Sequence, residues 1–361
     1  MIRSVVQASQ VLLVFQSSSQ SLSFQDVVAM TAIPRNACNR LLYTLQECGL
    51  IESAGEHRYR LSAGSRPAKR MRIGYGSQGQ DCSFSRAVLK SLQLAAEQNA
   101  IELLVVDNRY AAKAALRNAE KLARERIDLA IEFQSNEAIA GEVAGKFRSQ
   151  NVPMIAVDIP HPGAIYFGTD NYQGGLLAGR ELGSWTKRHW GGTADRLLLV
   201  GMTRAGWCVR TRLRGLEDGI KESLGSSAPP ITALDGDGQF EISLNAVRQY
   251  LRSAKDQRIL VAAANDSSAL GVLRAFEEAG RSNQCAVIGY NGEWDARAEL
   301  REPRTRLIGS IALFPEQYGP KLIRLASDML ANRPVSSAYF VKHSFITSEN
   351  VDRFYPNDHL L

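Results

Sequence analysis

The chain has 361 residues, which is too long for one small hydrophobic core, so two or three folding units are expected. Hydrophobic residues make up 45% and charged residues 22% of the sequence, and no apolar run approaches the ~18 residues that a membrane span needs. This composition excludes a disordered chain and predicts a soluble globular protein without membrane contact. The net charge of +6 is uneven, because residues 1–70 hold eight Lys and Arg against four Asp and Glu, while the remaining residues hold 35 against 33.

Five scattered cysteines without a Cys-x-x-Cys spacing and five isolated histidines offer no cluster of ligands. We therefore expect reduced thiols, no metal site and no cofactor. The continuous apolar run near the start, residues 11–15, is shorter than the ~7–15 residues of a signal-peptide core and has no small-residue cleavage site behind it. A cytoplasmic location is expected.

Helical patterns occupy the front of the chain. A first helix is predicted because four apolar residues recur at helical spacing: Val5, Ala8, Leu12 and Phe15. The pair Ser23 and Asp26 has the spacing of a capping box, so a second helix should begin there and run to about residue 30.

A third helix is predicted over residues 34–48, with Pro34 in its first turn. On a helical wheel one side is expected to face the core through Ala37, Leu41, Thr44, Leu45 and Cys48. The opposite side carries hydrogen-bonding groups: Arg35, Asn36, Asn39, Arg40 and Tyr43. Arg can bind guanine and Asn adenine bidentately, and either can bind phosphate, so this side suits the major groove of DNA.

After Gly49, which suits a helix C-cap, a strand pair is expected to turn near residues 54–56. This pair would be the wing of a winged helix-turn-helix, with His57 and Arg58 near the DNA backbone or the minor groove. Helices in this order, a wing and local positive charge favour DNA binding over a solvated helix face in a small interaction domain. Residues 64–70 are small, basic and contain a proline, which predicts a linker after a DNA-binding domain of residues 1–63.

The front segment resembles the winged-helix domain of isocitrate-lyase-regulator-type (IclR) transcription factors over residues 3–63. The resemblance is carried by residues 33–45 (IPRNACNRLLYTL), 49–51 (GLI) and 59–61 (YRL). It implies a DNA-binding transcription regulator. Because one short recognition helix makes a small footprint, we expect a homodimer on a palindromic operator.

From residue 71 onward, strand and helix patterns alternate. Strands are expected at 71–75, 101–106, 128–133, 154–157, 197–200, 231–234, 259–263 and 286–290, with helices between them. Such alternation predicts right-handed βαβ units and parallel sheets. The expected fold class is therefore α/β, with two Rossmann-like lobes behind the winged helix.

A glycine motif near the start of this part offers an alternative function. Gly74, Gly76 and Gly79 satisfy G-x-G-x-x-G after a strand, and Asp107 ends the next strand, which would suit an NAD(H)-sensing repressor. However, residues 80–83 separate the last glycine from the helix, and the acid lies 28 residues beyond it rather than about 20. We therefore prefer a different ligand and keep NAD(H) as the alternative.

A longer series of motifs extends over residues 71–346. It consists of Phe84 and residues 151–158 (NVPMIAVD), 168–175 (GTDNYQGG), 212–215 (RLRG), 265–271 (NDSSALG) and 288–292 (IGYNG). Taken together, this series resembles the type I periplasmic sugar-binding fold, as in ribose-binding proteins and the effector domains of lactose-repressor-like regulators. The resemblance implies an effector domain over residues 71–361 that closes on a sugar or polyol. Its first lobe would comprise about 71–170 and 312–337, and its second lobe about 171–311 and 338–361.

Ligands of open α/β sheets bind beyond the carboxyl ends of the strands. The candidate ligand-binding residues are therefore Phe84, Glu132, Asp158, Arg212, Asn265 and Asn291, with Trp207 as a second aromatic plate. By resemblance, Phe84 stacks on the sugar ring, Asp158 and Arg212 bind hydroxyls, and both asparagines are polar contacts of the second lobe.

Two apolar residues, Ile159 and Leu313, stand where related proteins carry polar ones. One wall of the site should therefore be less polar than in a simple pentose site, which leaves a deoxy or otherwise modified sugar, or a non-sugar, open. No G-x-S-x-G, P-loop or H-E-x-x-H motif occurs. An enzyme is therefore not expected, although Glu132 and Asp158 could serve as the carboxylate pair of a sugar hydrolase.

Overall fold

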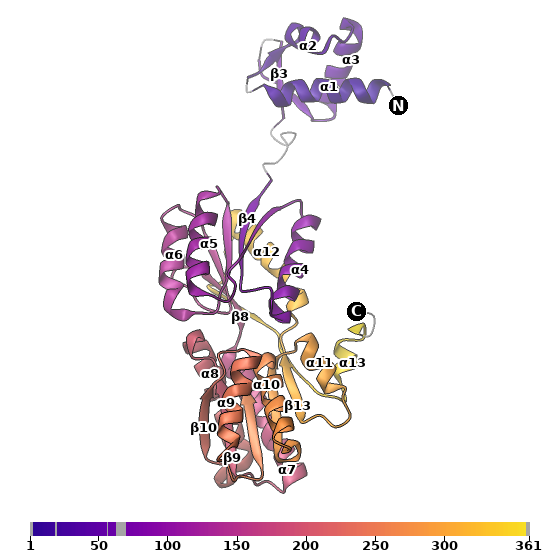
Figure 1. The fold of residues 1–361 in the computed structure, drawn as a ribbon. Helices are drawn as coiled ribbons and strands as arrows, with labels where there is room; N and C mark the ends of the chain where they lie inside the picture. Colours follow the sequence, from indigo (N-terminus) through magenta and orange to yellow (C-terminus); the bar gives the residue numbers. More distant parts are fainter. Residues whose placement is uncertain (1–2, 19, 56, 63–69, 359–361) are drawn as a thin grey trace. The chain divides into compact units, whose positions relative to one another are not determined.

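The computed structural model describes residues 3–18, 20–55, 57–62 and 70–358. The chain divides into two compact units, a first unit of residues 1–70 and a second unit of residues 71–361 (Figure 1). In the described residues no helix is both long and apolar enough to cross a membrane.

The first unit combines helices with a small antiparallel sheet. Its helices are α1 (Arg3–Ser17), α2 (Phe24–Thr31) and α3 (Arg35–Glu47). Its strands β1 (Leu22–Ser23), β2 (Ile51–Ser53) and β3 (Arg58–Leu61) pair in the order β1-β3-β2, so that β2 and β3 form the expected wing. The core consists of apolar side chains from all three helices and the sheet, among them Val11, Phe15, Val27, Cys38, Leu42, Leu45 and Ile51.

The expected capping box at the start of α2 is present. The backbone N–H of Asp26 donates to the Ser23 hydroxyl at 3.2 Å, and the Asp26 carboxylate accepts the Ser23 backbone N–H at 2.8 Å. The Ser23 hydroxyl also donates to the Asp26 carboxylate at 2.8 Å, and the two hydrogen bonds that the carboxylate accepts lower the pKa of Asp26. Helix α3 ends at Glu47, and Gly49, two residues later, has a φ of +70°, a conformation that glycine adopts without strain. The start of α2 and the end of α3 are therefore both marked in the sequence, by Ser23 and Gly49 respectively.

The apolar faces of α1 and α3 are rotated from those that we expected. Val5 is 59% exposed, whereas Val11 in α1 is fully buried. In α3 the buried residues are Cys38, Leu42 and Leu45, while Thr44 and Cys48 are exposed, and Ala37 and Leu41 are half-buried. The helix thus packs along the spacing i, i+4, i+7 that begins at Cys38, because a free cysteine behaves as a small apolar side chain.

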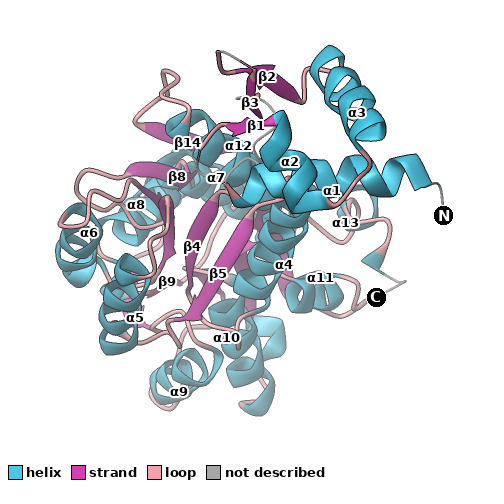
Figure 2. Cartoon of the chain, turned by 90° about the horizontal axis from the view of Figure 1, so that it is seen from above, coloured by secondary structure: helices cyan, strands magenta, loops and turns pink. Residues whose placement is uncertain are grey.

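The first lobe of the second unit contains a parallel sheet with the strand order β14-β8-β7-β6-β4-β5. Its strands are β4 (Arg72–Ser77), β5 (Glu102–Asp107), β6 (Leu129–Phe133), β7 (Met154–Val157), β8 (Ile165–Thr169) and β14 (Ala338–Val341). Helices α4 (Ser83–Gln98) and α12 (Tyr318–Leu330) cover one face, and α5 (Ala112–Arg124) and α6 (Ala140–Arg148) cover the other (Figures 1 and 2).

The second lobe contains a sheet with the order β10-β9-β11-β12-β13-β15, in which the β13–β15 pair is antiparallel and the others are parallel. Its strands are β9 (Arg196–Gly201), β10 (Ile231–Asp235), β11 (Ile259–Ala263), β12 (Cys285–Asn291), β13 (Leu307–Ala312) and β15 (Ser344–Ile346). Its helices are α7 (Asn171–Trp190), α8 (Trp207–Leu224), α9 (Phe240–Leu251), α10 (Asp266–Glu278), α11 (Trp294–Leu300) and α13 (Val351–Phe354). The expected α/β class with two parallel-dominated sheets is confirmed.

The chain passes between the lobes after β8, after β13 and after β14. We expected the last passage at residue 338, but β14 pairs with β8 in the first lobe, from Ala338 opposite Tyr166 to Val341 opposite Thr169. The passage therefore follows Val341, and residues 338–341 belong to the first lobe rather than to the second. No strand pattern indicates β14 in the sequence, because it is short and half-buried, with Phe340 62% exposed.

Candidate ligand-binding cleft and DNA-binding surface

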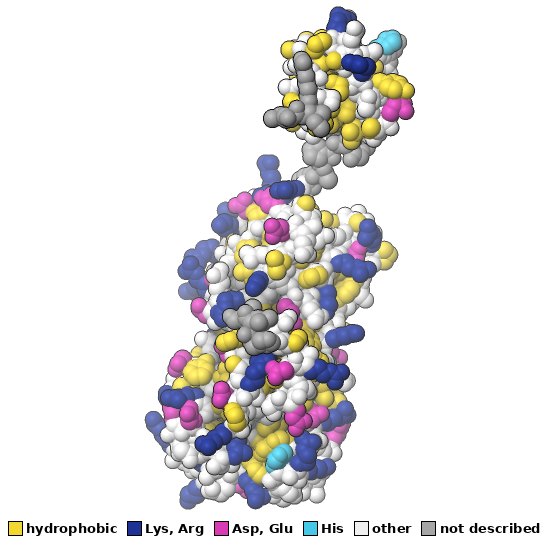
Figure 3. Space-filling model, turned by 90° about the vertical axis from the view of Figure 1, so that its right-hand side faces the viewer, with side chains coloured by type: hydrophobic (Ala, Val, Ile, Leu, Met, Phe, Trp, Pro, Cys, Tyr) yellow, Lys and Arg dark blue, Asp and Glu magenta, His cyan; other side chains and the backbone are white. Residues whose placement is uncertain are grey.

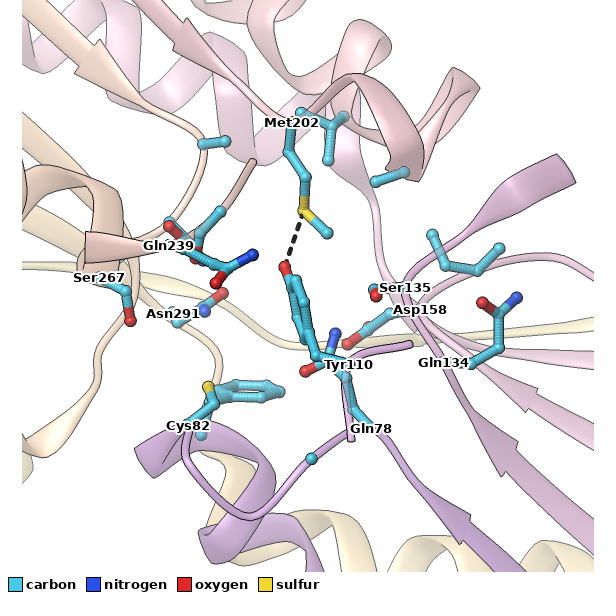
Figure 4. Close-up of a pocket in the computed structure, with 18 of the residues that line it drawn as sticks. Gln78, Cys82, Tyr110, Gln134, Ser135, Asp158, Met202, Gln239, Ser267 and Asn291 are labelled. Atoms are coloured by element: carbon cyan, nitrogen blue, oxygen red, sulfur yellow. Dashed lines mark hydrogen bonds between the residues drawn. The ribbon is translucent and has the colours of Figure 1, made fainter. Parts of the chain in front are cut away.

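A cleft of about 380 Å³ lies between the lobes of the second unit. This volume is near the small end of the ~300–1,000 Å³ range of ligand sites. The cleft is lined by residues that follow the carboxyl ends of strands in both sheets, including Gln78, Tyr110, Gln134 and Asp158 of the first lobe and Met202, Gln239, Asn265 and Asn291 of the second (Figure 4). This is the position that parallel sheets offer to a small ligand.

The structure brings most of the expected ligand-binding residues together. The cleft is lined by Phe84, Asp158, Arg212, Asn265 and Asn291. Phe84 is held at the start of α4 by edge-to-face contacts with Phe133 and Tyr318, at ring-centroid distances of 6.2 and 5.7 Å.

Asp158 directly follows β7 in a left-handed conformation, with φ of +60°. Its side chain borders the cleft, and its Oδ1 atom is buried without a hydrogen-bond partner in the described part of the chain. Burial raises the pKa of this carboxyl to about 7, while the nearby Arg212 acts in the opposite direction. An unpaired buried carboxyl oxygen is costly unless a ligand donates to it.

Arg212 is fixed in place by contacts within the second lobe. Its Nε and Nη2 atoms donate to Asn171 Oδ1 at 3.0 and 2.8 Å, its Nη1 donates to the carbonyl of Ala264, and its guanidinium lies 3.7 Å from the centre of the Tyr290 ring. Among the described residues three of its five N–H groups have partners, which leaves two for a ligand. Asp170 caps α7 by accepting the backbone N–H of Gln173 at 3.0 Å.

The two asparagines are partly committed to the protein. Asn265 caps α10, because its Oδ1 accepts the Ser268 N–H at 2.9 Å, and its Nδ2 donates to the Gly238 carbonyl at 2.8 Å. Asn291 donates from Nδ2 to Glu293 Oε1 at 2.8 Å. Each amide can therefore make only part of its hydrogen bonds to a ligand.

Glu132 does not line the cleft, contrary to our expectation. It is fully buried inside β6, where its Oε1 accepts the Asn108 Nδ2 at 2.7 Å and its Oε2 has no partner among the described residues. Burial raises the pKa of Glu132 to about 8. Glu132 is the penultimate residue of β6, which ends at Phe133, so it lies within the sheet rather than beyond its edge.

Trp207 does not line the cleft either. Its side chain is 58% exposed at the start of α8, and its backbone N–H donates to the Glu137 carboxylate at 3.1 Å. The sequence pattern places Trp207 close to Arg212 along the chain, but the turns of α8 direct the indole away from the cleft.

Tyr110 is a cleft residue that the sequence analysis missed. Its hydroxyl donates to the Asp237 carbonyl of the second lobe at 3.1 Å, and Arg204 of that lobe donates from Nη1 to the Tyr110 carbonyl at 2.9 Å. Arg109 and Tyr110 both have left-handed φ angles, 51° and 54°. This turn carries the ring across the cleft, and no residue pattern indicates it.

The glycine motif does not form a dinucleotide site. Gly74 and Gly76 lie within β4, and a Cβ atom at Gly76 would collide with the carboxyl group of Glu132. Helix α4 begins only at Ser83, so Gly79 is not at a helix N-terminus where pyrophosphate could bind. The first two glycines instead make room for buried side chains, and the NAD(H) alternative is not supported.

In the first unit, the expected DNA-binding residues of α3 are all exposed: Arg35, Asn36, Asn39, Arg40 and Tyr43. The Arg35 guanidinium lies 5.5 Å from the centre of the Phe24 ring. Figure 2 shows α3 beside the β2–β3 wing. Here His57 is exposed, and Arg58 donates from Nε to the Ser21 hydroxyl at 2.9 Å, so Arg58 is held against its own domain.

Charge on the second unit is mixed. On the face shown in Figure 3, Lys and Arg side chains are interspersed with Asp and Glu side chains over this unit. Many of them form ion pairs, such as Arg180 with Glu222 at 2.6 Å and Arg248 with Glu278 at 2.6 Å. In the described residues no group of three or more His, Cys, Asp or Glu is arranged to hold a metal ion.

Comparisons with protein families match both units. A model described as "Periplasmic binding protein domain" matches residues 73–334, and a model described as "IclR helix-turn-helix domain" matches residues 4–55. The ribose import binding protein of Escherichia coli (strain K12) is 25% identical over 260 residues, which cover 71% of this chain and 84% of that protein.

Solved structures share the fold of the second unit. A solute binding protein from Agrobacterium vitis with bound allitol has a TM-score of 0.72 and 17% identity, and the match covers 80% of this chain and 99% of that chain. A protein from Mycobacterium smegmatis in complex with β-D-fucofuranose has a TM-score of 0.71 and 18% identity, with coverage of 80% and 95%.

Proposed function

Because the chain belongs to the periplasmic binding protein domain family and also carries an IclR-type helix-turn-helix domain, we propose that it is a transcription regulator whose DNA binding responds to a sugar or polyol in the interlobe cleft. The observation that carries the proposal is the cleft itself. It has room for a small molecule, and Asp158, whose Oδ1 is buried without a partner among the described residues, is one of the residues that line it. A ligand hydroxyl that donates to this carboxylate would offset part of the cost of its burial.

The chemistry of the cleft suits a polyol. The carboxylate of Asp158 accepts hydroxyl protons, Arg212 retains N–H donors, and the aromatic ring of Phe84 offers an apolar surface to C–H groups. The ligands named for the related proteins, ribose, allitol and β-D-fucofuranose, are all small polyhydroxylated molecules, which supports the same class here. The mechanism requires binding rather than catalysis, so we propose no enzymatic step.

Ligand binding would act by changing the angle between the lobes. The passages after β8, β13 and β14 allow one lobe to rotate against the other, and a ligand that contacts both lobes favours the closed arrangement. We further propose that the protein acts as a cytoplasmic homodimer, so that lobe rotation changes the spacing of two recognition helices on a palindromic operator. In each α3, the side chains of Arg40, Asn36 and Asn39 would read bases or bind phosphate.

The proposal is tested by measuring DNA binding with and without sugar. Duplexes that bind the full-length protein are first selected from a random pool. Their Kd is then measured by fluorescence anisotropy in the presence of ribose, allose, allitol and a panel of hexoses. We expect at least one compound to change the Kd tenfold or more, and direct calorimetry to show that it binds the protein.

The variant Asp158→Asn tests the site. It should abolish the response to the sugar while the Kd for DNA without sugar stays unchanged. Asp328→Asn is the matched control, because Asp328 lies on α12 and pairs with Arg333 at 2.7 Å away from the cleft. The proposed function would be contradicted if no duplex could be selected, or if no compound changed the Kd for DNA.

A further inference from the structure

One wall of the cleft is entirely apolar. Ile159 of the first lobe and Met202, Ala205, Val209 and Ala264 of the second pack together, and each is at most 9% exposed. All of them also line the cleft. We call this set the apolar wall.

Tyr110 extends the apolar wall with its ring. Figure 4 shows the ring pointing from the first lobe towards Met202, whose sulfur lies 3.5 Å from the Tyr110 hydroxyl. That hydroxyl already donates to the carbonyl of Asp237 at 3.1 Å. Tyr110 therefore presents its ring to a ligand, while its donor is used within the protein.

The polar groups of the cleft lie outside this wall. Asp158 lines the cleft on the first lobe, and Ser267 and Asn291 line it on the second. Arg212 lines it as well, beside the wall, where its Nη1 donates to the backbone carbonyl of Ala264. Asn265, which follows Ala264 of the apolar wall, has its Oδ1 and one N–H committed to the protein. The side chains of the apolar wall contain no nitrogen or oxygen, and the sulfur of Met202, a weak acceptor, lies against the Tyr110 hydroxyl, so the wall offers a ligand hydroxyl no strong hydrogen bond.

Building on the proposed function, we propose that the cleft selects a 6-deoxyhexose, whose ring hydroxyls meet the polar groups around Asp158 and whose terminal methyl packs on the apolar wall. A hexose carries a CH₂OH group in place of this methyl. Its hydroxyl would lose hydrogen bonds to water without gaining any from the wall, whereas a methyl group gains by leaving water.

Matched sugar pairs test the inference on the full-length protein. Calorimetry compares D-fucose with D-galactose, L-rhamnose with L-mannose and D-quinovose with D-glucose, and adds ribose, allose and allitol. We expect the 6-deoxy sugar of at least one pair to bind ten times more tightly than its parent, a difference of about 1.4 kcal/mol.

Variants of the wall link the preference to these residues. Met202→Gln adds an amide at similar length and should reduce the preference for the 6-deoxy sugar at least threefold, because the amide can bond the extra hydroxyl of the parent. Met202→Leu keeps the wall apolar and should retain the preference. Val209→Thr, which adds a hydroxyl with nearly the same shape, repeats the test at a second position of the wall.

The outcomes separate this inference from the proposed function. If hexoses bind as tightly as their 6-deoxy partners, or only ribose, allose or allitol binds, the selection of a 6-deoxyhexose is wrong and the proposed sugar sensor stands. If Met202→Gln and Val209→Thr both leave the preference unchanged, the apolar wall is not its cause and the inference is wrong. If none of the compounds binds, the proposed function fails together with it.

Discussion

Glu132 should make the stability of the second unit depend on pH. The carboxyl is fully buried, and the Asn108 amide is its hydrogen-bond partner in the described residues. Burial raises its pKa from an ordinary value of 4.5 to about 8. The substitution Glu132→Gln keeps the shape and an oxygen that can accept from Asn108, and removes the titration.

The direction of the pH dependence follows from the protons that the folded and unfolded states bind. Between pH 4.5 and pH 8 the folded protein keeps the Glu132 proton, whereas the unfolded chain has lost it, so the free energy of unfolding falls as the pH rises. Each pKa unit corresponds to about 1.4 kcal/mol. Between pH 5 and pH 8 the wild-type protein should therefore lose about 3 to 4 kcal/mol relative to Glu132→Gln.

Urea unfolding followed by tryptophan fluorescence measures this difference. All four tryptophans lie in the second unit, so their signal is specific to it. Burial also raises the pKa values of Asp158, Asp266 and Glu293, but both proteins contain these groups, and their contribution cancels in the comparison. Parallel stability curves for the two proteins from pH 5 to pH 8 would refute the reasoning.

Further predictions concern packing, capping and DNA binding. Gly175→Ala in α7 should destabilise the second unit by about 3 kcal/mol, because the new Cβ would collide with the backbone carbonyl of Arg212. Gly145→Ala in α6 places its Cβ where no atom lies within 4 Å, so this substitution should stabilise the unit by about 0.5–1 kcal/mol. Urea unfolding of both variants measures the two changes in the free energy of unfolding. Ser23→Ala removes the capping box and should destabilise the first unit by about 1 kcal/mol, measured by circular dichroism. Arg40→Ala should weaken binding to a selected duplex by about 1–3 kcal/mol if Arg40 contacts a base. If Arg40 contacts phosphate, the substitution should weaken binding to all DNA sequences alike. The Kd for selected and unrelated duplexes distinguishes the two roles, and an unchanged Kd would contradict both.

The alternation of strand and helix patterns predicted the architecture of both lobes, because buried parallel strands form apolar runs that are easy to distinguish from amphipathic helices. The expected strands at 71–75 and 154–157 correspond to β4 and β7. Elements such as β8, β14 and α11 were not predicted from the sequence. These are short or half-buried, and their position depends on partners that are distant in the sequence.

The cleft could be predicted in part. Asp158 and Arg212 were expected from their place after strands and from a resemblance, and both line the cleft. Whether a residue near a strand end points into the cleft depends on where the strand ends and on how the next helix is oriented. These features place Glu132 within β6 and leave the side chain of Trp207 outside the cleft. Tyr110 enters the cleft through a left-handed turn whose conformation no residue pattern marks.

The late position of β14 has a consequence for synthesis on the ribosome. The helix-turn-helix domain is complete when residue 62 has emerged. The sheet of the first lobe is complete only after residues 338–341 have been made, because β14 pairs with the edge of β8. Domains fold as units in the order in which they are made, and an uncovered strand edge invites pairing with other chains. A nascent chain that stalls before β14 therefore carries a complete helix-turn-helix domain and an incomplete second unit. Under the proposed function, early termination would yield a fragment whose DNA binding no effector regulates.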